Sequence, residues 1–275
     1  MKTASIGVFD SGFGGLTVLK AITSLLPQES ISYFADTAHL PYGNKTKEQI
    51  IEYSSQSIEF LAEKGIKLLV IACHTSCVTS FKALEKKFSF PIIGIADSGI
   101  KALISQEKTE HLAFLGTQTT VSSGFYQQKI QEKLPLAKVT GVACPLFVPL
   151  VESGYVNNPL LMQSTVQEEL RSLKKCTPSL SAVLLACTHY PLLMGAIQKE
   201  LGPHIHLIDP SESCAKEVQK TLQELNLQNY SSHPPQHQFY VSDNPTKFHS
   251  IGKLFLPSLL KPTLCPLEPS SCNCQ

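Results

Sequence analysis

Two cysteines with matched surroundings are the residues of this sequence best placed to do chemistry. Cys73 opens the triplet Cys-His-Thr and Cys187 opens the triplet Cys-Thr-His, each directly after an apolar run. A nearby imidazolium or helix N-terminus stabilises the thiolate, and hydroxyls beside a helix N-terminus can hydrogen-bond a carboxylate. A single Cys with His would suggest acyl transfer. Two such thiols suggest one acid/base group on each side of a carbon atom, which is the chemistry of racemisation or epimerisation.

A glycine-rich loop, residues 10–17, follows the first apolar run. A dinucleotide-binding fingerprint would need glycine where Thr17 stands, and the Gly-Lys-Ser/Thr of a phosphate loop is absent. The remaining functional interpretation is a tight turn that presents Asp10 and Ser11, with Asp10 binding an ammonium group or orienting a base. A turn with a capping aspartate is the alternative. Two more polar loops, 36–43 and 116–120, could also contact a polar ligand.

The remaining cysteines do not form a metal-binding pattern. Cys73 and Cys77 have only a Cys-x3-Cys spacing, and Cys187 with His189 makes half a site. The C-terminal cysteines lack paired Cys-x2-Cys spacing. We therefore expect neither a metal nor any other cofactor.

Alternating β-rich and amphipathic segments must position these residues. Strands are predicted at 5–9, 31–35, 66–72, 91–95, 112–115, 138–143, 182–186, 205–208 and 238–241. Several are continuous apolar runs, typical of strands covered on both faces. Helices are predicted at 48–64 and 160–175, and another begins after Asp209 with proline at its first position. This alternation predicts α/β layers with mainly parallel sheets, while 261–275 is expected to be a mobile tail.

Two segments are echoed along the chain. Residues 68–75 resemble 183–189, and residues 6–12 resemble 93–99. If the echo reflects duplication, the protein consists of two similar α/β domains that face each other.

The composition excludes several classes of protein. With 43% hydrophobic residues among 275, the chain is neither disordered nor fibrous. A net charge of +1 gives no electrostatic footprint for nucleic acid or an acidic membrane. The densest apolar run, 68–73, is far shorter than the roughly 18 to 20 residues that span a bilayer, and residues 1–10 lack the core of a signal peptide. We expect a soluble cytoplasmic protein whose nine cysteines are mostly reduced.

Together, these segments resemble the cofactor-independent aspartate/glutamate racemase superfamily, and glutamate racemases in particular. The resemblance covers nearly all of residues 5–260. It rests on GVFDSGFGGLTV at 7–18, Asp36 with PYG at 41–43, VIAC at 70–73, Gly116-Thr117 with Thr120, PLVE at 149–152, and CTHYP at 187–191. Each motif is weak alone, but the ordered set is highly specific.

The resemblance implies two pseudo-symmetric open α/β domains, 1–96 plus 209–260 and 97–208, with the active site at their interface. It implies that L- and D-glutamate are interconverted without a cofactor, and that D-glutamate supplies peptidoglycan synthesis. Cys73 and Cys187 would be the acid/base thiols, Asp10 would assist Cys73, and Glu152 with His189 would assist Cys187. The implied substrate-binding residues are Asp10, Ser11, Tyr42, Gly43, His74, Thr75, Thr117, Thr120, Thr188 and His189. Glutamate is the expected partner, with no nucleic acid and no membrane, and a homodimer is left open.

One residue departs from the family pattern. The family normally has Asn-Thr-Ala after the first cysteine, whereas this chain has His74, Thr75 and Ser76. Histidine is larger than asparagine and can be charged. It could donate to the substrate, lower the pKa of Cys73, or block glutamate. A binding protein without turnover and a racemase of another acidic amino acid therefore remain as alternatives. A Cys hydrolase is a third alternative, and the matched surroundings of the two thiols argue against it.

Overall fold

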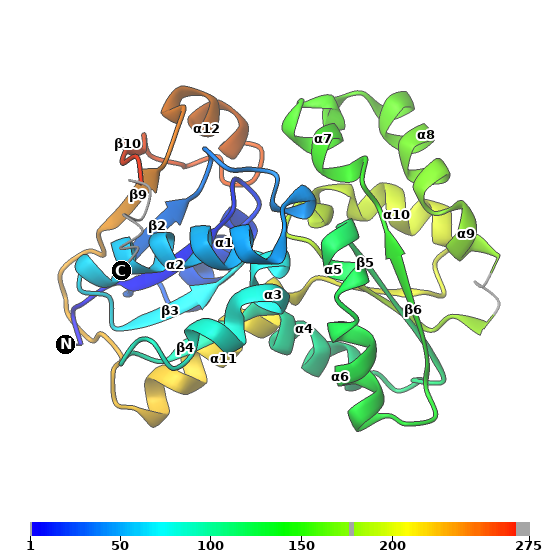
Figure 1. The fold of residues 1–275 in the computed structure, drawn as a ribbon, viewed down its shortest axis with the longest axis horizontal. Coiled ribbons are helices and arrows are strands. Elements are labelled where there is room, and N and C mark those ends of the chain that lie inside the picture. The colour runs from blue at the N-terminus through cyan, green and yellow to red at the C-terminus, as the bar shows by residue number, and fades with distance from the viewer. Residues whose placement is uncertain (1, 176–178, 268–275) are drawn as a thin grey trace, which may run out of the picture.

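The computed structural model describes residues 2–175 and 179–267. Two separate parallel sheets form two lobes that lie side by side (Figure 1). The first sheet has six strands in the order β10-β9-β2-β1-β3-β4, and the second has four in the order β6-β5-β7-β8. This confirms the predicted α/β class with two open, parallel sheets.

The strands of the first sheet are β1 (Ile6–Asp10), β2 (Ile31–Ala35), β3 (Leu68–Ile71), β4 (Ile92–Gly94), β9 (His237–Val241) and β10 (Thr263–Leu264). The strands of the second are β5 (His111–Gly116), β6 (Lys138–Ala143), β7 (Ala182–Ala186) and β8 (His206–Ile208). The α-helices are α1 (Leu16–Leu25), α2 (Lys47–Glu63), α3 (His74–Leu84), α4 (Ile95–Ile104), α5 (Gln118–Ser122), α6 (Phe125–Lys133), α7 (Phe147–Glu152), α8 (Pro159–Glu169), α9 (Arg171–Lys174), α10 (Met194–Leu201), α11 (Pro210–Glu224) and α12 (Pro245–Gly252). Short 3-10 helices are η1 (Tyr42–Asn44), η2 (Tyr155–Asn157) and η4 (Tyr190–Leu193).

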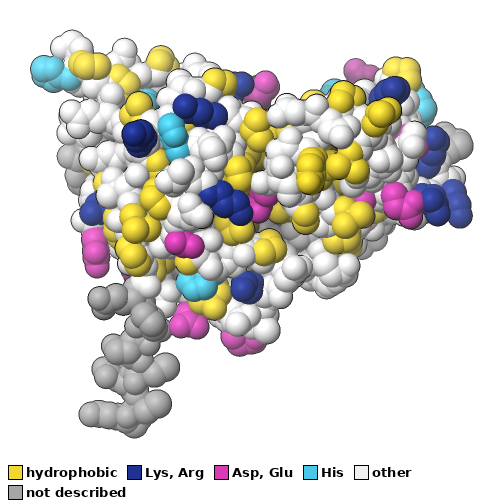
Figure 2. Space-filling view, turned by 90° about the horizontal axis from the view of Figure 1, so that it is seen from above, with side chains coloured by type: hydrophobic (Ala, Val, Ile, Leu, Met, Phe, Trp, Pro, Cys, Tyr) yellow, Lys and Arg dark blue, Asp and Glu magenta, His cyan; other side chains and the backbone are white. Residues whose placement is uncertain are grey.

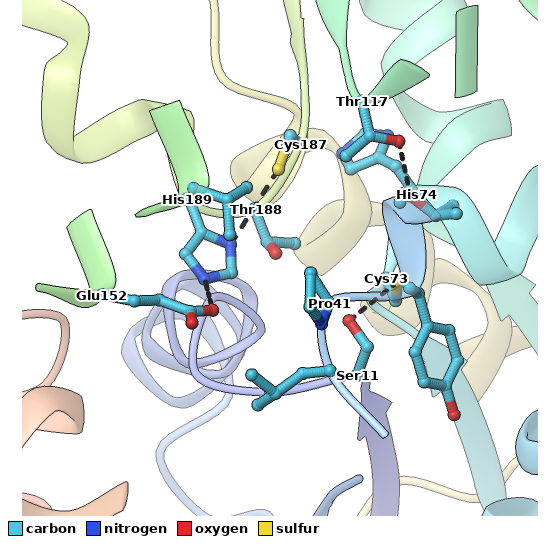
Figure 3. Close-up of a pocket in the computed structure, with 15 residues that line it drawn as sticks. Ser11, Pro41, Cys73, His74, Thr117, Glu152, Cys187, Thr188 and His189 are labelled. Carbon is cyan, nitrogen blue, oxygen red and sulfur yellow. Dashed lines mark hydrogen bonds and ion pairs between the residues drawn. The ribbon is translucent and has the colours of Figure 1, made fainter. Parts of the chain in front are cut away.

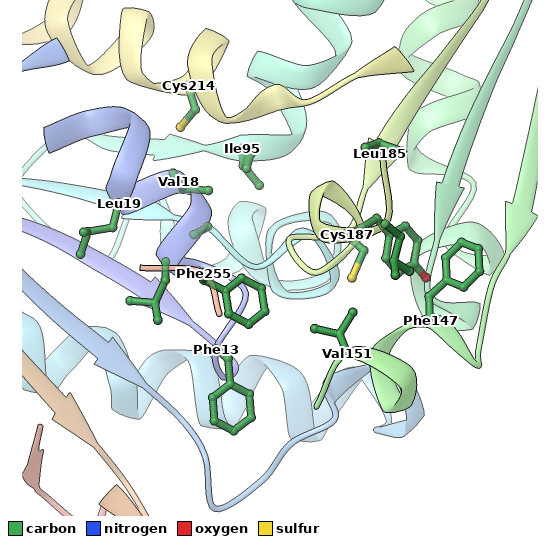
Figure 4. Close-up of a cluster of buried hydrophobic side chains, with 14 of the residues drawn as sticks. Phe13, Val18, Leu19, Ile95, Phe147, Val151, Leu185, Cys187, Cys214 and Phe255 are labelled. Carbon is green, nitrogen blue, oxygen red and sulfur yellow. The ribbon is translucent and has the colours of Figure 1, made fainter. Parts of the chain in front are cut away.

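The central strands of each sheet are buried on both faces, as continuous apolar strands predict. In β3, Leu68 and Val70 pack on the side of α1 and α11, while Leu69 and Ile71 pack on the side of α2 and α3. The first of these two clusters runs on into the second lobe, where it includes Leu185 and Phe147 (Figure 4). The lobes therefore share buried apolar surface.

All nine predicted strands are present, with ends that differ by a few residues at most. Local signals also set helix starts: Thr46 and Gln49 form a capping box at α2, and the Asp209 side chain accepts from the Ser211 backbone N–H at 2.9 Å at the start of α11. The helix expected over 160–175 is broken in two at Leu170, whose side chain is buried.

The expectation of a mobile tail over 261–275 is wrong for Thr263 and Leu264. These two residues form β10 beside β9, and the Cys265 backbone N–H donates to the Val241 carbonyl at 2.8 Å. Two exposed residues carry no periodic signal, so the strand is visible only through its pairing. Residues 268–275, with Cys272 and Cys274, lie outside the described part of the chain, as does Cys176.

The internal echo is half correct. Strand β3 is third in the run β2-β1-β3-β4, and β7 is third in the run β6-β5-β7-β8, so residues 68–75 and 183–189 occupy equivalent places. The echo between 6–12 and 93–99 is wrong, because the counterpart of β1 is β5, whereas residues 95–99 belong to α4.

The face of the molecule seen from above shows no concentration of one charge (Figure 2). Basic and acidic side chains are interspersed with hydrophobic ones over the face seen from above (Figure 2). Within the described residues, no helix combines the length and apolar character needed to cross a bilayer.

Candidate active site

A cavity lies between the lobes, at the carboxyl ends of strands from both sheets, where open α/β sheets bind ligands. It contains about 390 Å³ of space not filled by atoms, part of it open to solvent. Eleven of the predicted residues line it: Ser11, Tyr42, Gly43, Cys73, His74, Thr75, Thr117, Glu152, Cys187, Thr188 and His189. Figure 3 shows Cys187, His189 and Glu152 on one side of this space and Ser11 with Cys73 on the other.

Cys73 lies between β3 and α3 and is a protonated thiol. It caps α3, accepting from the Ser76 backbone N–H at 3.4 Å, and its Sγ lies 3.3 Å from Ser11 Oγ. Burial and the nearby Asp10 carboxylate raise the pKa of Cys73 to about 12, although Ser11 and Ser76 act in the opposite direction. This thiol can therefore deliver a proton.

Cys187 follows β7 and has a different environment. Its Sγ lies 3.9 Å from His189 Nδ1, and His189 Nε2 lies 3.1 Å from Glu152 Oε1. Burial lowers the pKa of His189, but the contacts with Cys187 and Glu152 outweigh it and raise the pKa to about 10. His189 therefore carries a positive charge at neutral pH, directly beside the Cys187 sulfur.

Asp10 is buried behind the cavity rather than on its wall. Its Oδ1 accepts from the Gly12 backbone N–H at 2.9 Å, and its Oδ2 accepts from Thr188 Oγ1 at 3.4 Å. Burial raises the pKa of Asp10, while the positive charge of His189 opposes that rise. Asp10 thus links the β1–α1 loop of the first lobe to the Cys187 loop of the second.

Threonine hydroxyls from both lobes form a cluster. Thr75 Oγ1 lies 2.9 Å from Thr117 Oγ1 and 3.1 Å from Thr120 Oγ1. Thr120 is buried behind the other two and does not line the cavity. Hydroxyls can turn to donate to a carboxylate, and the described lining contains no lysine or arginine.

The loop after β2 contributes the residues of η1. Tyr42 donates to Asp36 Oδ2 at 2.7 Å, and Ser242 donates to Asp36 Oδ1 at 2.8 Å, so Asp36 holds this loop from behind. Thr119 donates to the Gly43 carbonyl at 2.8 Å from the opposite lobe. Asp36 belongs to a motif of the family resemblance but was not predicted as a site residue. Four further residues line the cavity without having been predicted, namely Gly12, Leu40, Pro41 and Val148, and Val148 carries no sequence signal.

His74 is a neutral side chain here. It is buried at the start of α3, and burial lowers its pKa to about 3. The hypothesis that its charge lowers the pKa of Cys73 is therefore wrong, and the pKa of Cys73 is raised instead.

The described residues contain no group of three or more His, Cys, Asp or Glu side chains that could hold a metal ion. The cavity holds two thiols with unlike surroundings, Cys73 and Cys187, and such groups can serve as acid and base.

Comparisons with known proteins point to one family. Residues 6–218 match the model of the Asp/Glu/hydantoin racemase family. A glutamate racemase from Syntrophus aciditrophicus is 40% identical over 251 residues, covering 91% of this chain and 92% of that protein. A crystal structure of glutamate racemase from Francisella tularensis with D-glutamate matches with a TM-score of 0.90 and 32% identity, over 98% of this chain and 99% of that one. A Bacillus anthracis glutamate racemase isoform matches with a TM-score of 0.92 and 32% identity, over 97% and 99%.

Proposed function

Because the chain belongs to the Asp/Glu/hydantoin racemase family, we propose that it interconverts L- and D-glutamate through Cys73 and Cys187. It is an amino-acid racemase, and its glutamate racemase relatives support glutamate as the substrate. The observation that carries the two-thiol assignment is the pair of cysteines on opposite lobes of one cavity.

With one enantiomer of glutamate as substrate, the Cys187 thiolate removes the Cα proton from one face. The Cys73 thiol donates its proton to the opposite face, so the configuration inverts and the thiol and thiolate exchange roles. The other enantiomer reacts by the reverse path. The negative charge that develops at Cα spreads onto the α-carboxylate, where preorganised donors stabilise it most.

The neighbours of each thiol support these roles. Glu152 and His189 assist Cys187 by holding positive charge beside the thiolate. Asp10 assists Cys73 by keeping it protonated at rest, since its carboxylate raises the pKa of the thiol.

We assign substrate binding to Ser11, Tyr42, Gly43, His74, Thr75, Thr117, Thr188 and His189 on the cavity wall. Asp10 and Thr120 act from behind, through Thr188 and Thr75 respectively.

Exchange of the Cα proton with solvent tests the proposal. In D2O, either enantiomer of glutamate should gain deuterium at Cα, and both Cys73→Ala and Cys187→Ala should lose racemisation by at least 100-fold, since each removes an acid/base group. Full racemisation by either variant would refute the two-thiol assignment. Saturable glutamate binding without exchange would favour the binding-protein alternative, and faster turnover of aspartate would change the substrate.

The remaining assignments follow the family resemblance. We place the protein in the cytoplasm, with D-glutamate supplied to peptidoglycan synthesis, as one domain of residues 1–96 plus 209–260 and another of 97–208. A homodimer is the assembly that sedimentation should test.

A further inference from the structure

A buried pair joins the two lobes beside Cys73. His74 opens α3 of the first lobe, and Tyr126 lies in α6 of the second. The His74 Nδ1 atom lies 2.5 Å from the Tyr126 hydroxyl, and both side chains are at most 2% exposed. His74 also lines the cavity, yet its buried Nε2 has no hydrogen-bond partner among the described residues. A buried polar atom without a hydrogen-bond partner costs free energy. A ligand that supplies the partner would remove this cost and so bind more tightly.

The proton count of this pair selects one tautomer. Burial lowers the pKa of His74 to about 3 and raises that of Tyr126 well above 10, so a neutral ring faces a protonated phenol. If Nδ1 carried the ring proton, the Tyr126 O–H and the Nε2 lone pair would both lack partners among the described residues. If Tyr126 donates to Nδ1, only the Nε2–H is left over. The second arrangement leaves one unpaired group instead of two and is preferred.

We propose that Tyr126 is a positioning residue, which fixes His74 as an Nε2–H donor to the α-carboxylate of the bound amino acid. The inference rests on the proposed function and names a residue outside its acid/base machinery. The α-carboxylate is the expected acceptor because it is bonded to Cα, the carbon that exchanges its proton. His74 directly follows Cys73, the thiol that donates a proton to Cα. A neutral donor there stabilises the charge that develops during reaction.

This arrangement explains how histidine can stand where related racemases normally have asparagine. An asparagine amide always offers N–H donors, whereas a neutral imidazole offers one donor whose position depends on the tautomer. Histidine therefore needs a partner that sets its tautomer. Because an asparagine needs no partner to offer a donor, we expect Tyr126 to be dispensable in the His74→Asn variant.

Nuclear magnetic resonance of the free protein tests the tautomer directly. With 15N-labelled histidine, the signals of His74 are assigned by their loss in His74→Asn. We expect an unprotonated Nδ1 and a protonated Nε2 throughout the range from about pH 6 to 8. Adding glutamate to the Cys73→Ala/Cys187→Ala double variant should shift the Nε2–H proton downfield. The opposite tautomer, a charged ring or an unmoved Nε2–H signal would overturn the inference.

Kinetics tests the coupling between the two residues. Tyr126→Phe should lower kcat/KM about 10- to 100-fold, the range expected when a hydrogen bond to a charged group is lost. In the His74→Asn background, the same change should have no further effect. An equal loss in both backgrounds would show that Tyr126 acts by packing alone and would overturn the proposal. Tyr155→Phe, at an exposed tyrosine, is the matched control.

The two proposals fail separately. Absence of deuterium exchange in the unmodified protein would remove the racemase function but would leave the tautomer measurement valid. Normal racemisation with the opposite tautomer would remove only the role of Tyr126.

Discussion

At the scale of single residues, the two thiols are chemically unequal before any substrate binds. Cys73 is held as a thiol by burial and by Asp10, whereas Cys187 adjoins the protonated His189. Matched local contexts predicted both cysteines, whereas the roles of Asp10, Glu152 and His189 beside them were implied by the family resemblance. It could not predict this inequality, because burial and the distance from His189 to Glu152 depend on tertiary packing.

Glu152 helps to set the charge of His189, and a substitution of Glu152 tests this role. Replacing Glu152 with Gln removes one of the contacts that raise the pKa of His189, so that pKa should fall from about 10 toward 6.5. Each unit of that fall means about 1.4 kcal/mol less stabilisation of the imidazolium that lies beside Cys187. We expect kcat/KM to drop at least tenfold and the alkaline limb of its pH profile to move to lower pH.

The same shift predicts how stability depends on pH. Because the folded-state pKa of His189 is raised, its contribution to the free energy of unfolding is complete below about pH 6.5 and disappears as the pH rises through about 10. In urea unfolding, the free energy of unfolding should fall less over this pH window in Glu152→Gln than in the unmodified protein. Glu168→Gln, at an exposed glutamate, is the control, and coincident pH profiles for the two variants would contradict the role of Glu152.

At the scale of elements, the β1–α1 loop is in close contact with the loop of the opposite lobe that contains Cys187. A Cβ atom on Gly14 would lie 2.2 Å from Thr188 Oγ1 and 2.7 Å from His189 Nδ1. Gly14→Ala should therefore push these loops apart, lowering kcat/KM at least tenfold and stability by about 1–3 kcal/mol. Kinetics and thermal unfolding measure the two effects.

Gly195, in α10, supplies the matched comparison. A Cβ there would meet no atom within 4 Å, so Gly195→Ala should leave activity unchanged and alter stability by at most about 1 kcal/mol, upward. Equal behaviour of the two alanine variants would show that close contact at Gly14 is unimportant.

Elements with a strong local signal were predictable, and contacts between loops were not. Apolar runs predicted nine strands, and Asp209 with Pro210 marked the start of α11. Strand β10 was missed because its two exposed residues carry no pattern. Thr75 and Thr117 come from different lobes, and no spacing along the chain reveals that their hydroxyls form a hydrogen bond.

At the scale of the whole molecule, two sheets share the strand order 2-1-3-4 and bring equivalent strand ends to one cavity. Hydrogen bonds such as Thr119 to Gly43 and Thr188 to Asp10 cross between the lobes around it. A ligand held by both lobes should therefore stabilise the entire chain rather than one half.

Binding of both enantiomers to a turnover-free protein tests this arrangement. The thiols lie on opposite sides of the cavity, so the same donors must hold the carboxylates of L- and D-glutamate alike. In the Cys73→Ala/Cys187→Ala double variant, each enantiomer at 100 times its Kd should raise the free energy of unfolding by about 2.7 kcal/mol, and Tm by roughly 5 °C or more. Thermal unfolding measures this, with glycine as the control ligand because it lacks the side-chain carboxylate. Stabilisation by one enantiomer alone would mean that the cavity is built for a single configuration, which a racemase with one thiol per face cannot have.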